Sequence, residues 1–230
     1  MLFRSKTSAG RSSLNVVFER TNQPRHDGNT IYLPQITART TEKELKDMMC
    51  STDHEVAHDL YSDFNILEEK NIDTSNSLLG IIMNVVEDSR VNSIEAMQYE
   101  GFRQLWDETS SNYFDKMVAD KEKIEASDFG KLITALFQWE THASGDLFPV
   151  TSVAAARVET NPAIMVKLDP FTERLHGLRH ELDKKSGSAK SYELAKDVFR
   201  ALGGDPDAEE KRNKDRKEGD RKSTRLNSSH

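Results

Sequence analysis

The stretch from Thr52 to Asp59 carries two histidines four residues apart, with a glutamate directly after the first, in the pattern H-E-x-x-H. Side chains four positions apart on an α-helix lie one above the other on one face, so His54 and His58 can reach one zinc ion together. Glu55 would then lie beside the metal, where a carboxylate can take a proton from zinc-bound water. The motif has this meaning only on a helix, so the segment has to be helical for a zinc site to form.

The residues around the motif predict such a helix. Thr41, followed three residues later by Glu44, forms a capping box, which often begins a helix. Apolar residues then recur at helical spacing as far as Leu60, and no Pro or Gly interrupts the segment up to Phe64. We therefore expect one helix that carries both histidines along the border of an apolar stripe.

Two short segments before this helix predict a small sheet. Residues 13–20 have a β-rich, partly alternating pattern. Residues 31–36 form a second run, which Pro34 is expected to end or to push to the edge of the sheet. Residues 21–30 between them are rich in turn formers. We expect these strands to lie over the H-E-x-x-H helix, with an edge from 31 to 36 that could pair with an extended substrate.

A second helix is predicted to begin near residues 73–76 and to extend to Trp106. Its first part is apolar nearly all round, which is typical of a buried helix, and Glu87, Asp88 and Arg90 follow at once. Charges that continue a buried run need partners or a metal. A catalytic zinc ion usually has three protein ligands and one position left for water. The charged residues of this helix are therefore the place to look for a third ligand.

Glu87 is the first candidate for that ligand, because a reversing loop between two antiparallel helices would bring it beside the histidines. Asp88 would then orient a histidine through its far ring nitrogen, with Asn84 on the same helix face. Arg90 would pair with either carboxylate or hold a reaction oxyanion. Asp88 is the main alternative as the third ligand, and Asp63 on the first helix is a more distant one.

Readings without a catalytic metal also remain open. A buried ion-pair cluster of Glu87 or Asp88 with Arg90 would lock the two helices together. A zinc ion closed by a fourth ligand, such as Cys50 or Asp88, would be structural, although a small buried thiol is the more ordinary role for Cys50. An ordinary helical domain with no metal is the third alternative.

The two motifs together resemble those of a known family. HEVAH at 54–58 and NVVEDSRVN at 84–92 are similar to the H-E-x-x-H and N-x-x-E-D-x-R motifs of a gluzincin-like metallopeptidase-type domain. That domain precedes von Willebrand factor A domains in bacterial and phage proteins, often described as CobT-like cobaltochelatase subunits. The resemblance covers about residues 28–106, including the lead-in DGNTIYLP.

The resemblance implies an α+β, mainly helical, zincin-like domain, in which a short N-terminal sheet and the H-E-x-x-H helix pack with a glutamate-bearing helix. It implies a MoxR-type AAA+ ATPase as a partner. The last acidic position of the family's second motif is Asn92 here, which weakens any role for a carboxylate at that position. The site residues that the resemblance implies are the zinc ligands His54, His58 and Glu87, the general base Glu55, and the supporting residues Asp88 and Arg90.

These features predict a zinc-dependent metallopeptidase domain that hydrolyses peptide bonds with a zinc-activated water. Zinc would lower the pKa of the water, Glu55 would accept its proton, and the hydroxide would attack a peptide carbonyl. The alternative is a non-enzymatic CobT-like adaptor that works with the AAA+ ATPase and a von Willebrand factor A domain, its zinc site structural or vestigial.

Composition limits the partners and the cellular compartment that we expect for the protein. The net charge of −7 gives no electrostatic reason to expect a nucleic-acid partner. A single cysteine fits a reducing compartment, so we expect a cytoplasmic protein, and no run of residues is long and apolar enough to predict a membrane span. An apolar fraction of 36% beside a charged fraction of 31% predicts that part of the chain is solvated.

The chain is expected to hold one domain. Residues 6–204 would form the zincin-like domain, with its N-terminus cut, and residues 205–219 a charged, disordered linker. The final segment 220–230, DRKSTRLNSSH, resembles the translation of a common sequencing adapter, and the start of the chain resembles the end of the opposing adapter. We therefore expect 1–5 and 220–230 to be foreign to the natural sequence and to take no part in the fold. A sequence cut in this way carries no information about a signal peptide.

Overall fold

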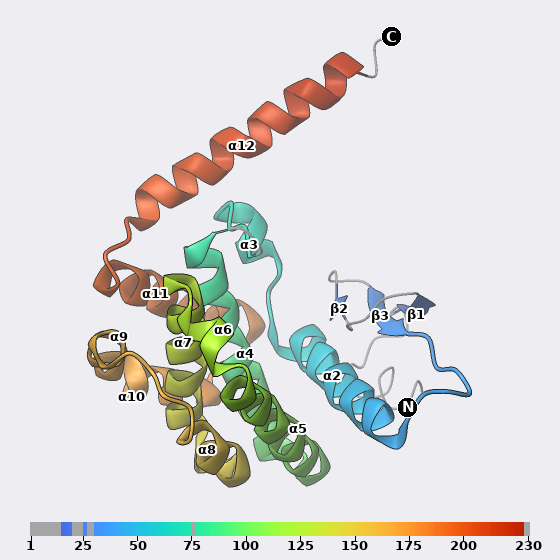
Figure 1. The fold of residues 1–230 in the computed structure, drawn as a ribbon. Coiled ribbons are helices and arrows are strands. Elements are labelled where there is room, and N and C mark those ends of the chain that lie inside the picture. Colours follow the sequence, from blue (N-terminus) through green and yellow to red (C-terminus); the bar gives the residue numbers. More distant parts are fainter. Residues whose placement is uncertain (1–14, 20–24, 27–29, 75–76, 228–230) are drawn as a thin grey trace.

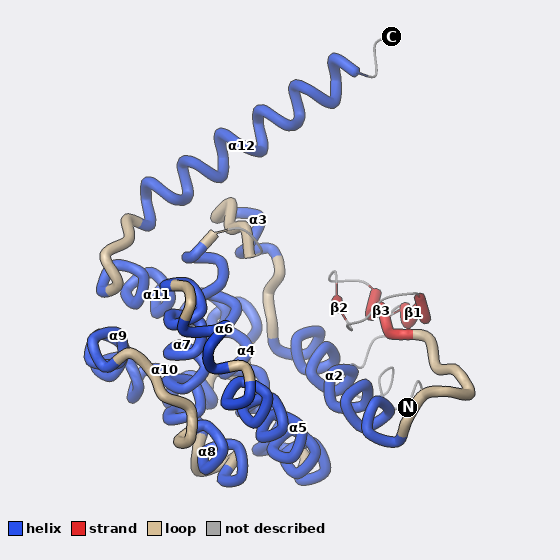
Figure 2. Tube along the Cα trace, viewed as in Figure 1, coloured by secondary structure: helices blue, strands red, loops and turns tan. Residues whose placement is uncertain are grey.

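The computed structural model describes residues 15–19, 25–26, 30–74 and 77–227. A small sheet lies against one helix, and that helix packs in turn on a bundle of further helices (Figures 1 and 2). The prediction of a mainly helical α+β fold is confirmed. The segment 1–5 and parts of the predicted strand 13–20 and turn 21–30 lie outside the described residues.

The sheet has three strands in the order β1-β3-β2. Strand β1, Asn15–Glu19, runs parallel to β3, Thr30–Pro34, and β2, Arg25–His26, pairs with β3 in the antiparallel sense. Pro34 ends its strand, as predicted, but β3 is the central strand. The predicted open edge at 31–36 is therefore wrong, because β1 and β2 occupy the two sides of β3.

Helix α2, Glu42–Tyr61, carries the histidine motif and supports the sheet. Its predicted capping box is confirmed: the Glu44 amide donates to Thr41 Oγ1 (3.2 Å) and the Thr41 amide to Glu44 Oε2 (2.7 Å). The buried strand residues Ile31 and Leu33 pack on Val56 of the helix. One face of α2 thus covers the sheet and leaves another face for the helices beyond.

The second helix is shorter than predicted. After α3, Asn65–Glu69, helix α4 spans Leu78–Gln98, and the chain breaks at Tyr99 (φ −130°, ψ 103°) before α5, Glu100–Ala119. A continuous helix to Trp106 is therefore wrong. The break lets α5 turn back and bury Phe102 completely in a cluster with Ala96 and Phe148.

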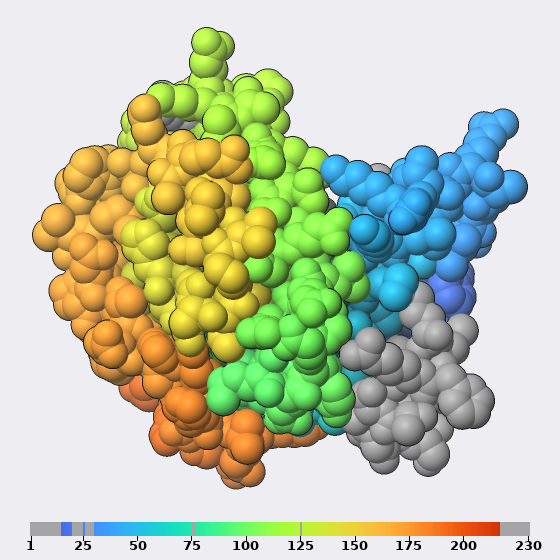
Figure 3. Space-filling model, turned by 90° about the horizontal axis from the view of Figure 1, so that it is seen from below, coloured from blue at the N-terminus to red at the C-terminus, as the bar shows by residue number. Residues whose placement is uncertain are grey.

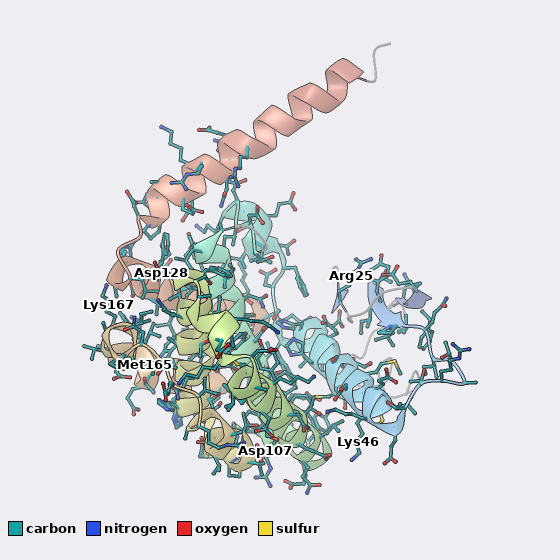
Figure 4. All side chains as sticks on the ribbon, viewed as in Figure 1. Arg25, Lys46, Asp107, Asp128, Met165 and Lys167 are labelled. Carbon is teal, nitrogen blue, oxygen red and sulfur yellow. The ribbon has the colours of Figure 1, made fainter. Side chains whose placement is uncertain are left out.

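Helix α5 joins two parts of the molecule. Lys46 of α2 donates to Glu108 Oε1 (3.0 Å), while Asp107 accepts from the amides of Val150 (3.1 Å) and Thr151 (2.7 Å) at the start of the next helical layer. Figure 4 labels Lys46 and Asp107 on these neighbouring helices, and Figure 3 shows α5 in green against α2 in blue. Because of these contacts, α5 is held on both sides.

The remaining helices build the main core around α4. The buried residues of this core include Leu79 and Val86 of α4, together with Leu136, Trp139 and Val198 from later in the chain. Among the described helices, none combines the length and the apolar composition that a bilayer crossing requires. The later elements are α6 Lys121–Glu125, α7 Asp128–Ser144, α8 Pro149–Ala155, α9 Pro162–Leu168, a 3₁₀ turn Asp169–Phe171, α10 Thr172–Gly177, a 3₁₀ turn Leu178–His180, and α11 Lys184–Ala201.

The last helix, α12 at Pro206–Asn227, projects away from the body of the molecule (Figure 1). The prediction of a disordered linker at 205–219 is wrong for its backbone, which is helical. Glu, Lys and Arg favour helices, and Pro206 occupies a first-turn position that suits proline. An ion pair between Arg212 and Glu209 (3.1 Å) and a hydrogen bond from the Tyr192 hydroxyl to Glu210 hold its first turns.

Gly80 is required where α4 begins. A Cβ atom built at this position would collide with the backbone carbonyl of Asp73, whereas one built at Gly101 of α5 would meet nothing within 4 Å. We expect Gly80→Ala to lower the free energy of unfolding by about 1–3 kcal/mol, because the loop before α4 must move. Gly101→Ala, the matched control, should be neutral or slightly stabilising. Urea unfolding measures both, and an unchanged Gly80→Ala protein would contradict this packing.

Candidate metal centre

Three side chains of the types that can bind a metal meet between α2 and α4. His58 Nε2 lies 2.9 Å and His54 Nε2 3.8 Å from the same oxygen, Oδ1 of Asp88. The two imidazole rings lie edge to face, 4.6 Å apart. Within the part of the chain that the structure describes, this is the one group of three such residues whose donor atoms all lie within 4.8 Å of one another. The predicted antiparallel approach of the two helices thus brings both histidines to a carboxylate.

The ring of His54 is held from two sides. Its Nδ1 lies 2.8 Å from Oδ1 of Asn92 on α4, and the indole of Trp106 on α5 stacks on the ring at 5.3 Å with an angle of 21°. An amide oxygen only accepts hydrogen bonds, so Nδ1 carries the proton. In the neutral ring, Nε2 then presents its lone pair to Asp88.

A short chain of hydrogen bonds fixes His58 in the same tautomer. Its Nδ1 lies 2.9 Å from Ser62 Oγ, and the Ser62 hydroxyl donates to Glu87 Oε1 (2.7 Å). The hydroxyl proton is used by Glu87, so the serine oxygen accepts from Nδ1–H of His58. The Nε2 lone pair of neutral His58 therefore also faces Asp88.

The carboxylate of Asp88 completes the donor group. Asn84, one turn earlier on α4, donates to its Oδ2 (2.9 Å), so Oδ1 is the oxygen directed at the histidines. Burial lowers the pKa of His58, but the hydrogen bond and the negative charge of Asp88 outweigh it, and the pKa is raised overall. Two imidazole lone pairs and a carboxylate oxygen that converge in this way repel one another until a proton or a metal cation lies between them.

Glu87 lies outside this donor group, although it is the ligand that the sequence first indicated. Arg90 donates to both of its oxygens (Nε–Oε2 3.0 Å, Nη2–Oε1 2.6 Å), and the hydroxyls of Ser62 and Ser188 donate to Oε1 (2.7 and 2.6 Å). Burial raises the pKa of Glu87, but these donors and the charge of Arg90 lower it to about 2. Glu87 acts on the centre through Ser62 and His58.

Arg90 is fully buried, and the hydrogen bonds that it donates go to groups outside the donor group. Besides Glu87, it donates to the carbonyls of Glu181 (2.7 Å) and Tyr61 (2.7 Å). These contacts join α4 to the end of α2 and to the chain just before α11. Arg90 therefore does not take the predicted oxyanion-holding role, and the ion pair with Glu87 that was the alternative is present instead.

Glu55 is half-buried on the same turn as the histidines, and its carboxylate makes no hydrogen bond to any other described residue. Its charge contributes to the raised pKa of His58. The other candidates lie elsewhere: Cys50 is buried, with a pKa raised to about 12 by burial, and Asp63 accepts from Asn65. Neither Cys50 nor Asp63 belongs to the donor group.

Several residues of the centre were missed from the sequence. Asn92 and Ser62 extend the series 84/88/92 on α4 and 54/58/62 on α2, so a search for further i, i+4 steps would have found them. Trp106, Ser188 and Glu140 carry no such signal, because separate helices bring them close. Burial raises the pKa of Glu140, on α7, to about 8, and the charge of Asp88 adds to the effect.

Comparisons with known proteins give no match: no protein-family model, no curated protein and no solved structure is similar to this chain.

Proposed function

We propose that the protein is a zinc-dependent metallopeptidase-like domain in which His54, His58 and Asp88 hold the metal. The observation that carries the proposal is the pair of Nε2 lone pairs, each fixed by a partner on the far ring nitrogen, that face one carboxylate oxygen. Two histidines and a carboxylate are a common ligand set of catalytic zinc. Zinc-binding histidines nearly always have such a partner on the other nitrogen.

Each residue of the chain has a defined role in this proposal. Zinc would supply a Lewis acid that activates water and polarises a peptide carbonyl. Glu55, next to His54 in the sequence and without another partner among the described residues, would take up the proton of the attacking water and pass it to the leaving amine. Asn92 and Ser62 orient the histidines.

The sheet packed on α2 is compatible with a zincin-like domain of the gluzincin type, so the proposal includes this fold. The third ligand would be Asp88 in place of the glutamate that the family pattern implies. The CobT-like adaptor with a MoxR-type ATPase partner is the competing function, and it would need a zinc site without turnover. Cys50 is not available as a closing fourth ligand, since it lies outside the donor group, which favours an open, catalytic site.

Glu55→Gln tests the proposed function. We expect the variant to bind zinc as the unaltered protein does and to lose peptide hydrolysis by about 10²-fold or more, since a general base contributes at least that much. Glu42→Gln, an exposed position on the same helix, is the matched control and should keep full activity. Zinc content by atomic emission and cleavage of a mixed peptide library are measured in parallel.

The outcomes separate the two functions. Hydrolysis that persists in zinc-loaded Glu55→Gln protein would exclude Glu55 as the base. Stoichiometric zinc with no hydrolysis of any peptide in the unaltered protein would favour the adaptor. A folded protein that takes up no zinc would overturn the metal centre itself.

A further inference from the structure

A small cavity lies beside His58, where α2 ends. It has a volume of about 50 Å³, and its walls come from the end of α2, from α3, from the first turns of α4 and from Ser188 of α11. Its apolar lining comes from Phe64, from Ile66 and Leu67 of α3 and from Met83 of α4. The ring of Phe64 lies 6.2 Å from that of His58. The cavity therefore borders the metal centre directly.

The lining favours an apolar occupant. Most of its polar groups are already engaged: Ser62 and Ser188 donate to Glu87, and Asn84 donates to Asp88. A polar group placed in the cavity would lose its water without gaining the donors or acceptors that these residues use among themselves. An aliphatic group would instead contact Ile66 and Met83 and lose nothing by desolvation.

The size of the cavity limits that group. A space of about 50 Å³ is a third of the roughly 150 Å³ that a benzene-sized cavity offers. A methyl to isopropyl group fits, and a phenyl or indole ring does not. Leu67 is half-buried at this wall, so its side chain sets the limit on one side.

Two residues connect the cavity to the centre. His58 lines it and presents Nε2 to Asp88, and Asn84 lines it and holds the other oxygen of Asp88. A peptide whose carbonyl lies at the centre would therefore have a neighbouring side chain within reach of the cavity. We infer that the domain selects peptides with a small aliphatic residue, alanine to valine, next to the cleaved bond. This inference rests on the proposed function and specifies its substrate class.

Amino-acid hydroxamates test the inference by binding alone. All share one zinc-binding group and one α-amino group, so a series of the glycine, alanine, valine and phenylalanine hydroxamates varies only the side chain. We expect zinc-loaded protein to bind the valine compound about 10-fold more tightly than the glycine compound, because the isopropyl group is buried. The phenylalanine compound should gain nothing over the glycine compound. Isothermal titration calorimetry gives the dissociation constants.

A matched pair of variants locates the effect. Leu67→Ala enlarges the cavity and should improve binding of the phenylalanine hydroxamate by about 10-fold. Leu132→Ala removes another half-buried leucine that packs on the same core but does not line the cavity, and the order of affinities should stay as in the unaltered protein.

The affinities of the hydroxamate series for the unaltered protein test the inference even if a variant is unstable. Binding of the glycine, alanine, valine and phenylalanine hydroxamates with equal affinities would overturn the cavity as a specificity site and leave the proposed function standing. Tighter binding of the phenylalanine than of the valine compound would overturn the size limit. Failure of zinc-loaded protein to bind any hydroxamate would overturn both the metallopeptidase proposal and this inference.

Discussion

Asp88→Ala protein is expected to lose its zinc, whereas Glu87→Gln protein is expected to keep it. Asp88 directs Oδ1 at both histidines, while both oxygens of Glu87 are used by Arg90 and two serines. Removing one of three ligands should weaken zinc binding on the order of 10³-fold, a third of the binding free energy typical of structural zinc sites. Glu87 acts on His58 through Ser62 and through its charge, and loss of such an outer partner costs about 10- to 100-fold.

Zinc per chain after dialysis against a graded series of chelators measures both affinities. His58→Ala serves as the positive control for loss of zinc, and Asp63→Ala as a nearby acidic control that should leave zinc in place. The reverse result, with zinc retained by Asp88→Ala and lost from Glu87→Gln, would restore Glu87 as the third ligand.

Arg90→Met should be among the most destabilising single changes in the molecule. It leaves the carboxylate of Glu87 buried without its cation, and breaking a buried ion pair from one side typically costs 3–5 kcal/mol. The double variant Arg90→Met/Glu87→Met should recover much of that loss, because no unpaired charge remains. Urea unfolding at neutral pH measures each free energy. A loss below about 1 kcal/mol for Arg90→Met would mean that the pair contributes no more than an exposed one.

The difference in unfolding free energy between the unaltered protein and Arg90→Met should depend on pH in a defined direction. Glu87 has a pKa of about 2 in the folded protein against an ordinary 4.5, so the unfolded chain binds the proton more readily. The stabilisation of ionised Glu87 by Arg90 and the two serines, about 3 kcal/mol together, is therefore complete above pH 4.5 and is lost as the pH falls towards 2. The difference in stability between the unaltered protein and Arg90→Met should narrow over that range. A difference that stays constant would contradict the low pKa of Glu87.

Local rules were sufficient to predict the helix that carries the histidines. The box formed by Thr41 and Glu44 gave its start, and the four-residue step from His54 to His58 gave the face that they share. The charged residues that follow a buried apolar run indicated that the third donor lies on the second helix. These features depend on residues a few positions apart, which is the range over which helical periodicity acts.

The choice between Glu87 and Asp88 could not be made from local rules. Neighbouring residues on a helix point about 100° apart, so a rotation of α4 about its axis by that angle would exchange the two carboxylates. That rotation is set by the core around Val86 and by Ser188, which reaches Glu87 from 101 residues further along the chain. Neither contact has a signature in the sequence near the motif.

The stacking of Trp106 on His54 was missed for a related reason. The turn at Tyr99 sends α5 back along α2, and the segment contains no proline to mark it. At 205–219 the sequence predicted disorder where the structure has a helix. The charged composition that is typical of disorder also has high helix propensity, and the first turns of the helix pack on Tyr192.

The order in which these contacts can form follows from their separation along the chain. The hydrogen bonds that connect the histidines to α4 join residues 30 and 38 positions apart, whereas the one from Ser188 to Glu87 closes a loop of 101. Short loops lose less chain entropy on closing than long ones do. Synthesis from the N-terminus therefore delivers every donor of the candidate metal centre well before the serine that helps hold Glu87 away from it. The separate roles of two adjacent carboxylates are completed only when α11 has left the ribosome and docked.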